Sequence, residues 1–441
     1  MRIRILRMGM LVLAPLALSP ALQAQSRSQS QPQSQSYAIR GATIHTMAGE
    51  PIQNGTVVIQ NGKIAAVGAN VAVPGGAQVI NGNGLHVYPG MMDGVSQLGL
   101  TEVGQGAPGT VDVNELGDFN PHLMAATAVH PASEHIPVAR ANGVTHTLSV
   151  PGGGVISGQG VLMHLSGWVM EEMAIRRSGA MVVQWPSLSG GGGFGFGGGG
   201  GFRRRPFTEI KRDYDRRIEE LGDWLERARH YAQAMQKGDK AGFERDLKLE
   251  GLVPVVQGKL PMLIMANGHR EIKDAVEFCE KEKVKMILGR GREAPQVASL
   301  LKEKNIPVIL GAAHALPATE DTPYDQPFSI AGQLHKAGVK IAVATFDSSD
   351  SRTLPYEAAN YVPFGLPHDE ALRAITVNPA QIYGIADQLG TIEQGKVANL
   401  IVTTGDPLEI TTQVRHLFIE GRLTSTDNKH QQLFEKYMAR P

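Results

Sequence analysis

The chain contains a single cysteine, Cys279, among its 441 residues. It therefore cannot form a disulfide bond within itself. It also has no excess of either charge, because 42 lysine and arginine residues balance 42 aspartate and glutamate residues. A chain without a surplus of one sign is not expected to bind nucleic acid or an anionic membrane through its overall electrostatic field.

The sequence also lacks an apolar run at its start that is long enough to span a membrane. The run over residues 8–18 is shorter than the about 20 residues that a spanning helix needs. It follows three arginines and precedes small residues near position 24, an order typical of a cleaved secretory signal. We interpret residues 1–24 as a signal peptide and expect a periplasmic or secreted protein without a membrane anchor after cleavage. A retained anchor is the alternative.

Two regions of β character are expected on either side of a central domain. Residues 25–36 are mostly glutamine and serine, and such a segment cannot bury enough apolar surface to become ordered, so we interpret it as a disordered linker. From residue 37 the sequence turns to alternating and β-branched residues, with Asn61-Gly62 suited to a hairpin turn. Residues 386–424 return to this pattern. We expect residues 37–88 and 386–424 to form one small composite β-sandwich domain.

The central region, residues 89–385, contains short apolar segments of the kind buried in parallel sheets, among them VTHTLSV, VLMHLS, PMLIMAN and KIAVATF. Amphipathic segments of helical period separate the later ones, so that strand and helix units repeat roughly every 20 to 30 residues. This rhythm predicts an α/β fold with a TIM-like (β/α)8 barrel. An open doubly wound sheet is the alternative, although Ser149–Gly160 resembles a dinucleotide-binding turn only loosely.

One insertion, at about residues 189–250, interrupts the rhythm of the barrel. It begins with a glycine tract that is expected to be mobile. Behind the tract, apolar residues recur every three or four positions between Thr208 and Lys237, which predicts one long amphipathic helix. We expect its apolar face to pack on the flank of the barrel. A lid over the site and a contact between subunits are the alternatives.

Two sequence signatures stand at the two ends of the central region. The first is VYPGMMDGVSQLG, Val87 to Gly99, and the second is NPAQIYG followed by GTIEQGKVANL, Asn378 to Leu400. Both are similar to segments of amidohydrolases of the imidazolonepropionase and hydantoinase type, and the resemblance covers about residues 37–423. It implies a TIM barrel with a composite β domain, and a hydrolase that acts on carbon–nitrogen bonds other than peptide bonds, in amides, cyclic amides or small peptide-like substrates.

The resemblance also implies a divalent metal, zinc if the protein is active, held by histidines and carboxylates at the ends of the barrel strands. In this chain the implied ligand positions carry side chains that bind metals poorly: Val95, Gln97, Met265 (or Asn267) and Arg290. Only Asp347 matches a carboxylate of the family, where it would act as a ligand and general base. A shift of register by one residue would place Phe346 there instead.

Histidines elsewhere in the barrel region offer a way to rebuild a metal site. Three of them lie within or just after expected strands: His146, His164 and His314. If they converged, they could bind zinc. Histidines that are hydrogen-bonded in the core or at its rim are the commoner explanation of such a pattern.

A glycine-rich turn is a candidate for binding substrate. It includes Gly152, Gly153 and Gly154, with Gln159 close behind, and follows an expected strand. Backbone amides in such a turn can bind an anion or an oxyanion. A tight turn that needs glycine for steric reasons is the simpler explanation.

The sequence leaves two functions open. The first is an exported hydrolase of small amide or peptide-like substrates, with a metal anchored by Asp347 and a barrel histidine. The second is a catalytically inactive relative, either a binding protein or the partner subunit of an active paralogue, because ligands are missing at several positions together. A second copy of the chain is the other possible partner.

Overall fold

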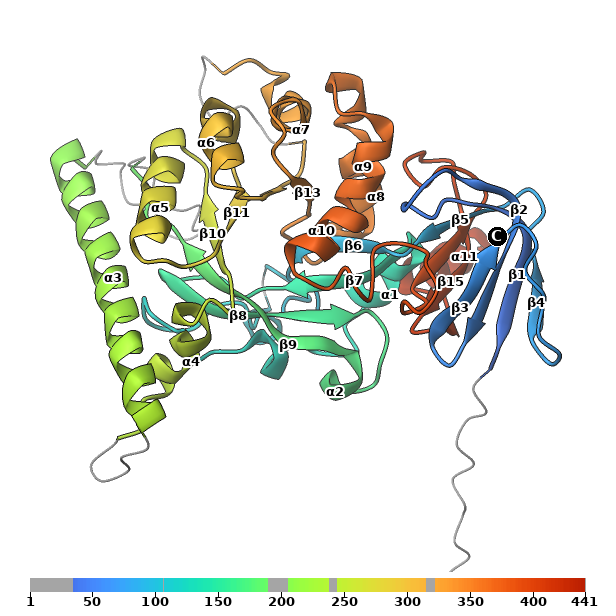
Figure 1. The fold of residues 1–441 in the computed structure, drawn as a ribbon, viewed down its shortest axis with the longest axis horizontal. Helices are drawn as coiled ribbons and strands as arrows, with labels where there is room; N and C mark the ends of the chain where they lie inside the picture. Colours follow the sequence, from blue (N-terminus) through green and yellow to red (C-terminus); the bar gives the residue numbers. More distant parts are fainter. Residues whose placement is uncertain (1–34, 106, 189–204, 238–243, 315–321, 441) are drawn as a thin grey trace, which may run out of the picture. The chain divides into compact units, whose positions relative to one another are not determined.

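The computed structural model describes residues 35–105, 107–188, 205–237, 244–314 and 322–440 (Figure 1). The predicted signal peptide, nearly all of the linker and the glycine tract lie outside these residues. Within the described ranges, no helix is both long and apolar enough to cross a membrane.

The first of two sheets joins the two ends of the chain. It has eight strands in the order β16-β15-β14-β5-β1-β2-β3, with β4 paired to β1, and the two chain ends meet where β5 pairs antiparallel with β14. This confirms that the two β regions form one domain. The strands are β1 (Tyr37–Ile44), β2 (Ile52–Gln60), β3 (Lys63–Gly68), β4 (Gln78–Asn81), β5 (His86–Pro89), β14 (Leu400–Thr403), β15 (Val414–Ile419) and β16 (Arg422–Thr424).

The strands of this composite β domain follow one continuous path and enclose an apolar core. The edge strand β3 returns to the segment before β14, where the Ile64 N–H donates to the Lys396 carbonyl at 2.9 Å. Phe418 is fully buried in the core, and the ring of Tyr37 lies edge-on to it with 5.1 Å between centroids. A residue from the end of the chain is therefore enclosed by strands from its beginning.

The second sheet is the predicted barrel. Its eight strands follow the order β13-β12-β11-β10-β9-β8-β7-β6, and it closes where the Phe346 N–H donates to the Val95 carbonyl at 2.8 Å. The strands are β6 (Met91–Ser96), β7 (Val144–Ser149), β8 (Ile156–His164), β9 (Ala174–Gln184), β10 (Met262–Ala266), β11 (Met286–Arg290), β12 (Val308–Leu310) and β13 (Ile341–Val343).

One strand departs from the expected parallel arrangement. β8, which contains the first four residues of the segment VLMHLS, pairs antiparallel with both β7 and β9. Only the six residues 150–155 separate β7 from β8, whereas a parallel connection needs a crossover of a dozen residues or more. The chain therefore reverses at the glycine turn, and the prediction of a parallel strand there was wrong.

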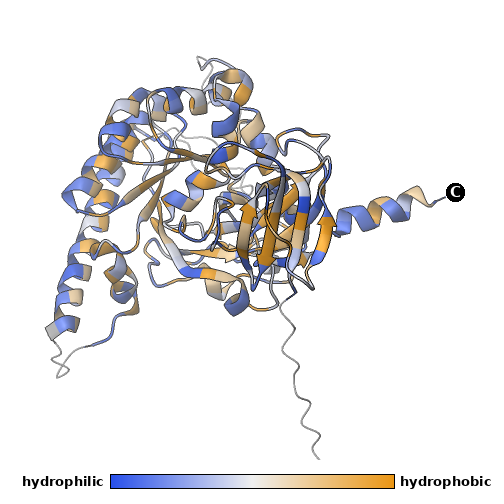
Figure 2. Cartoon of the chain, turned by 45° about the vertical axis from the view of Figure 1, so that its right-hand side comes forward, coloured by the Kyte–Doolittle hydropathy of each residue, from blue (hydrophilic) through white to orange (hydrophobic). Residues whose placement is uncertain are grey.

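Helices cover the outside of the later barrel strands (Figure 1). Residues 368–384 contain two short helices, and the C-terminal α11 extends from the body with Phe434 exposed (Figure 2). The α-helices are α1 (His135–Ala141), α2 (Met170–Met173), α3 (Phe207–Lys237), α4 (Leu247–Val256), α5 (His269–Lys281), α6 (Ala298–Glu303), α7 (Gln326–Lys336), α8 (Leu354–Ala359), α9 (His368–Ala374), α10 (Val377–Ile382) and α11 (Lys429–Met438). Short 3-10 helices are η1 (Pro108–Thr110), η2 (Ala125–Thr127), η3 (Ala294–Val297), η4 (Asp350–Thr353) and η5 (Val362–Phe364).

The long helix α3 is the predicted helix of the insertion, and it packs on the flank of the barrel. Its fully buried Leu221 and Leu225 belong to the main apolar core. Its Tyr214 hydroxyl donates to Asp274 of α5 at 2.6 Å and accepts a hydrogen bond from the Trp185 indole at 3.0 Å. These contacts agree with the interpretation of α3 as a flanking helix.

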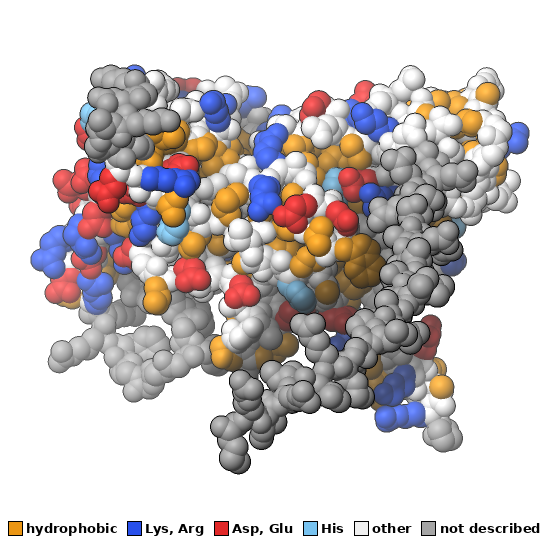
Figure 3. Space-filling view, turned by 90° about the horizontal axis from the view of Figure 1, so that it is seen from below, with side chains coloured by type: hydrophobic (Ala, Val, Ile, Leu, Met, Phe, Trp, Pro, Cys, Tyr) orange, Lys and Arg blue, Asp and Glu red, His pale blue; other side chains and the backbone are white. Residues whose placement is uncertain are grey.

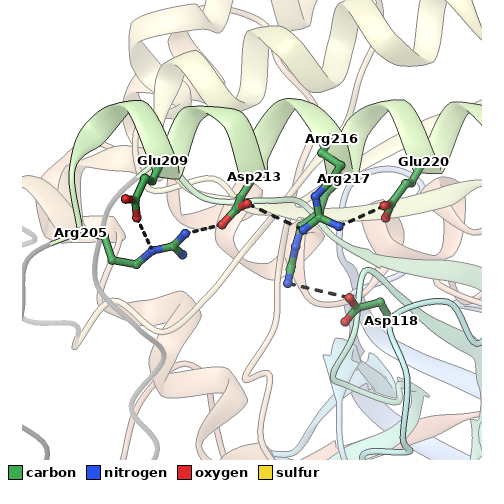
Figure 4. A network of polar contacts seen from close by, with 7 residues as sticks. All are labelled: Asp118, Arg205, Glu209, Asp213, Arg216, Arg217 and Glu220. Carbon is green, nitrogen blue, oxygen red and sulfur yellow. Dashed lines mark hydrogen bonds and ion pairs between the residues drawn. The ribbon is translucent and has the colours of Figure 1, made fainter.

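Charged side chains of the two signs are mixed on the surface. On the face drawn in Figure 3, basic and acidic side chains lie interspersed. The outer face of α3 carries a similar network, in which Arg217 reaches Asp118 at 3.8 Å (Figure 4). Exposed ion pairs of this kind contribute little to stability. On this face and along α3, charges of opposite sign therefore lie next to each other.

Candidate functional site

The carboxyl ends of β10, β11 and β12 and the loop after β13 surround a cavity of about 230 Å³. Ligands and substrates of TIM barrels bind at this end, which we call the barrel mouth. Larger hollows, of about 540 and 550 Å³, lie beside the β domain and at the opposite end of the barrel. The polar residues of the mouth cavity are Asn267, Arg290, Arg292, His314 and Thr345, and its apolar walls include Leu310, Ile330 and Phe346.

The positions implied for metal ligands do not form a metal site. Val95 and Met265 are buried in the apolar cluster that fills the barrel interior. Asn267 and Arg290 line the mouth cavity, and the Gln97 N–H lies 3.4 Å from the Asp347 carbonyl. In the described part of the chain, no three histidine, cysteine or acidic side chains are grouped closely enough to hold a metal ion. The residues present therefore do not fit the metal of the related hydrolases.

The carboxylate of Asp347 accepts hydrogen bonds from residues that follow it closely in the sequence. Its Oδ1 accepts hydrogen bonds from the Ser349 N–H at 2.7 Å, the Ser349 hydroxyl at 2.8 Å and the Asp350 N–H at 3.1 Å, at the start of η4. The neighbouring Phe346 lines the mouth cavity, whereas Asp347 does not. Of the two registers considered from the sequence, the fold therefore places Phe346 at the candidate site.

The three candidate histidines do not converge. His146 and His164 pair across β7 and β8 with 6.4 Å between ring centroids, at the end of the barrel that faces the β domain, where His164 Nδ1 lies 3.1 Å from the side-chain amide of Asn399. His314 lies at the mouth, where its Nε2 is 2.8 Å from the side-chain amide of Asn360. These histidines are hydrogen-bonded structural residues and form no rebuilt metal site.

The buried histidine pair makes a testable contribution to the pH dependence of stability. Burial, and then the nearby His164, lowers the pKa of His146 to about 3. Because protonation favours the unfolded chain, the stability that neutral His146 contributes is full above about pH 6.5 and is lost as the pH falls to about 3. In denaturant titrations, His146→Phe is expected to lose less stability than wild type over that range, by about 1 kcal/mol per pH unit. Equal slopes in the two proteins would contradict this.

Asp93, in the first signature, forms hydrogen bonds across the closure of the barrel. Its side chain is fully buried. Its two oxygens accept hydrogen bonds from the Thr345 N–H at 3.0 Å, the Thr345 hydroxyl at 2.6 Å and the Ser351 hydroxyl at 3.0 Å. Burial raises the pKa of this carboxyl to about 7, against these hydrogen bonds, which lower it. Asp93 therefore holds β6 to the loop that carries Phe346.

The glycine-rich turn between β7 and β8 makes close contacts with the chain beside it. The Gly152 N–H donates to the Val113 carbonyl at 2.8 Å. Gly153 and Gly154 have φ angles of +78° and +62°, and a Cβ on Gly154 would lie 2.9 Å from the Asp118 carbonyl oxygen. The amide nitrogen of Gln159 donates to the Pro121 carbonyl at 2.9 Å. These contacts match the steric explanation of the glycines.

Two arginines of the mouth cavity are the least expected feature of the site. Arg290 ends β11 with φ +73°, and Phe346 on the facing loop has φ +56°. The guanidinium carbon of Arg290 lies 5.7 Å from the centroid of the Phe346 ring. Arg292 lines the same cavity. The sequence carries a signal for this pair, Arg290-Gly291-Arg292 at the end of a predicted strand, although the resemblance pointed only to Arg290, as a position without its metal ligand.

Comparisons with known proteins place these observations in a family context. Residues 264–424 match the Amidohydrolase family model. The chain is 23% identical over 393 residues to Amidohydrolase tasK of Hapsidospora irregularis, which covers 83% of this chain and 39% of that protein. It is 32% identical over 136 residues to an imidazolonepropionase of Maricaulis maris, covering 30% of this chain and 32% of that protein. The chain thus spans about two fifths or less of these relatives.

A solved structure extends the likeness to the whole fold. The crystal structure of an amidohydrolase from Thermotoga maritima is similar over 88% of this chain and 99% of that one, with a TM-score of 0.76 and 25% identity. The composite β domain and the barrel are therefore shared with a complete chain of similar extent.

Proposed function

We propose that this chain, which belongs to the amidohydrolase superfamily, differs from the related hydrolases in its function. It binds a small molecule at the barrel mouth without metal-dependent hydrolysis. One observation carries the proposal. The implied ligand positions hold apolar, amide or cationic side chains, among them Val95, Met265 and Arg290, and two of these three are part of the apolar barrel interior.

The chemistry of the related hydrolases needs a metal that activates water and polarises a carbonyl. Valine and methionine in an apolar cluster offer a hard divalent cation no suitable donor, and arginine opposes it by charge. Two carboxylates near the closure of the barrel are already engaged, Asp93 with Thr345 and Asp347 with Ser349. The mouth is suited to holding a ligand, and these two carboxylates are not free to activate water there.

The test is elemental analysis of protein purified without an affinity tag or chelator, together with an assay against a panel of amides, cyclic amides and dipeptides. We expect far less than one zinc, manganese or iron per chain and no turnover above that of a heat-treated sample. About one metal per chain, with turnover that Asp347→Ala abolishes, would overturn the proposal.

Hydrolysis of carbon–nitrogen bonds is the second candidate function. It is supported by the family match over residues 264–424 and by a relative named as an imidazolonepropionase. The substrates would be amides, cyclic amides or small peptide-like molecules. The same assay separates the candidates, because turnover without bound metal would keep hydrolysis and exclude the metal-dependent mechanism.

We also propose that the protein acts outside the cytoplasm. The support is the order of charged, apolar and small residues over positions 1–24. Mass spectrometry of the protein from the periplasm of a Gram-negative host should find a chain that starts near residue 25. A full-length chain confined to the cytoplasm would contradict export.

A further inference from the structure

We propose that the barrel mouth binds the carboxylate of a small organic acid, with Arg290 and Arg292 holding the carboxylate and apolar walls holding the rest of the ligand. The inference rests on the proposed function in placing the ligand at the mouth. It adds the chemical class of that ligand.

The positive charges of Arg290 and Arg292 are not balanced by a carboxylate among the described residues. Neither Arg290 nor Arg292 lies within ion-pair distance of a carboxylate in the described part of the chain, whereas Arg229 on α3 pairs with Glu282 at 2.8 Å. The nearest acidic residue in sequence, Glu293, is paired with His269 at 2.7 Å. Two guanidinium groups at one cavity can form the paired, parallel hydrogen bonds that carboxylates accept.

The two cations are also close enough to affect each other. Arg290 is partly exposed to solvent, yet burial of part of its side chain, and then repulsion from Arg292, lowers its pKa. The repulsion between two like charges at one cavity is reduced when an anion binds between them. The protein therefore holds them in a state that a carboxylate ligand would stabilise.

Two residues of the cavity are held in strained backbone conformations. Arg290 and Phe346 adopt left-handed φ angles, +73° and +56°, which cost free energy in residues other than glycine. Both residues line the same cavity and their side chains lie against each other. Strained residues of this kind concentrate at ligand-binding sites, where the surrounding fold maintains them.

The remaining walls indicate the size and character of the ligand. Leu310, Ile330 and Phe346 are apolar, and the side-chain amide of Asn267 has no hydrogen-bond partner among the described residues, so it can bind a polar group of the ligand. The volume of about 230 Å³ is below the roughly 300 to 1,000 Å³ of sites for drug-sized molecules. A short aliphatic or single-ring carboxylic acid fits these features better than a highly charged phosphate ester.

The experiment measures binding of benzoate to the full mature chain by isothermal titration calorimetry. Benzamide serves as the neutral probe of the same shape, and inorganic phosphate as the alternative anion. The main variant is Arg290→Asn, because asparagine tolerates a left-handed φ and the fold should be kept. Arg415→Asn, which removes an exposed arginine of β15, is the matched control.

We expect benzoate to bind at least tenfold more tightly than benzamide or phosphate. Arg290→Asn should weaken benzoate binding at least tenfold at an unchanged melting temperature, and Arg415→Asn should leave it unchanged. Equal binding of benzoate and benzamide, tighter binding of phosphate, no binding of benzoate, or full benzoate affinity in Arg290→Asn would each overturn the carboxylate assignment. Finding a bound metal and turnover would instead overturn the proposed function and leave this assignment standing.

Discussion

Replacing Asp93 with alanine is expected to lower the free energy of unfolding by about 3 kcal/mol. The substitution removes the acceptors of three hydrogen bonds from Thr345 and Ser351 at a fully buried position. The Thr345 N–H would be left without its partner at a buried position of the barrel. Urea denaturation followed by circular dichroism measures the loss.

Asp93→Asn is the control, because it keeps the side-chain volume and one acceptor oxygen. The pKa of the folded Asp93 carboxyl is raised to about 7, so the stability that this group contributes is full below about pH 4 and is lost as the pH rises to 7. The advantage of wild type over Asp93→Asn should therefore shrink over that range. A loss below 1 kcal/mol in Asp93→Ala would show that the carboxyl does not fasten the barrel.

Replacing Phe418 with alanine is expected to cost about 3 to 5 kcal/mol. Phe418 is fully buried in the β domain, against Tyr37 from the other end of the chain. Removal of the ring leaves a cavity that the paired strands around it cannot fill. Thermal and urea denaturation of the purified variant measure the effect.

Ile410→Ala is the matched control in the same domain, because Ile410 is 77% exposed. It should change stability by less than about 0.5 kcal/mol. If Phe418→Ala were as mild as Ile410→Ala, the two ends of the chain would not share a cooperative core.

The sequence was most informative where its pattern depends on local geometry. The two signatures, with Asp93 in the first and Asn399 in the second, resemble amidohydrolase segments, and that resemblance implied a barrel bracketed by a composite β domain, as the pairing of β5 with β14 confirms. Helical spacing predicted α3 over nearly its full length. The apolar residues of α3 repeat at helical intervals, so its prediction needed no knowledge of long-range contacts.

Features set by packing could not be predicted in the same way. An apolar segment such as that of β8 has the same composition in a parallel or an antiparallel pair, so only the short connection from β7 reveals its direction. The position of Phe346 in place of Asp347 depends on a register of one residue. The pairing of Arg290 with Phe346 depends on two left-handed backbone conformations that no sequence pattern specified.

The reversed strand β8 has a consequence for the order of folding. β7, β8 and β9 form a meander whose pairs join residues close in sequence, such as His146 with His164. The closure of the barrel joins Asp93 to Thr345 across 252 positions. Because closing a longer loop costs more entropy, the meander can assemble first and serve as a template to which β10 to β13 add in turn. We therefore expect the seam between β6 and β13 to form last and to set the folding rate, which substitutions at Asp93 would slow more than substitutions in the meander.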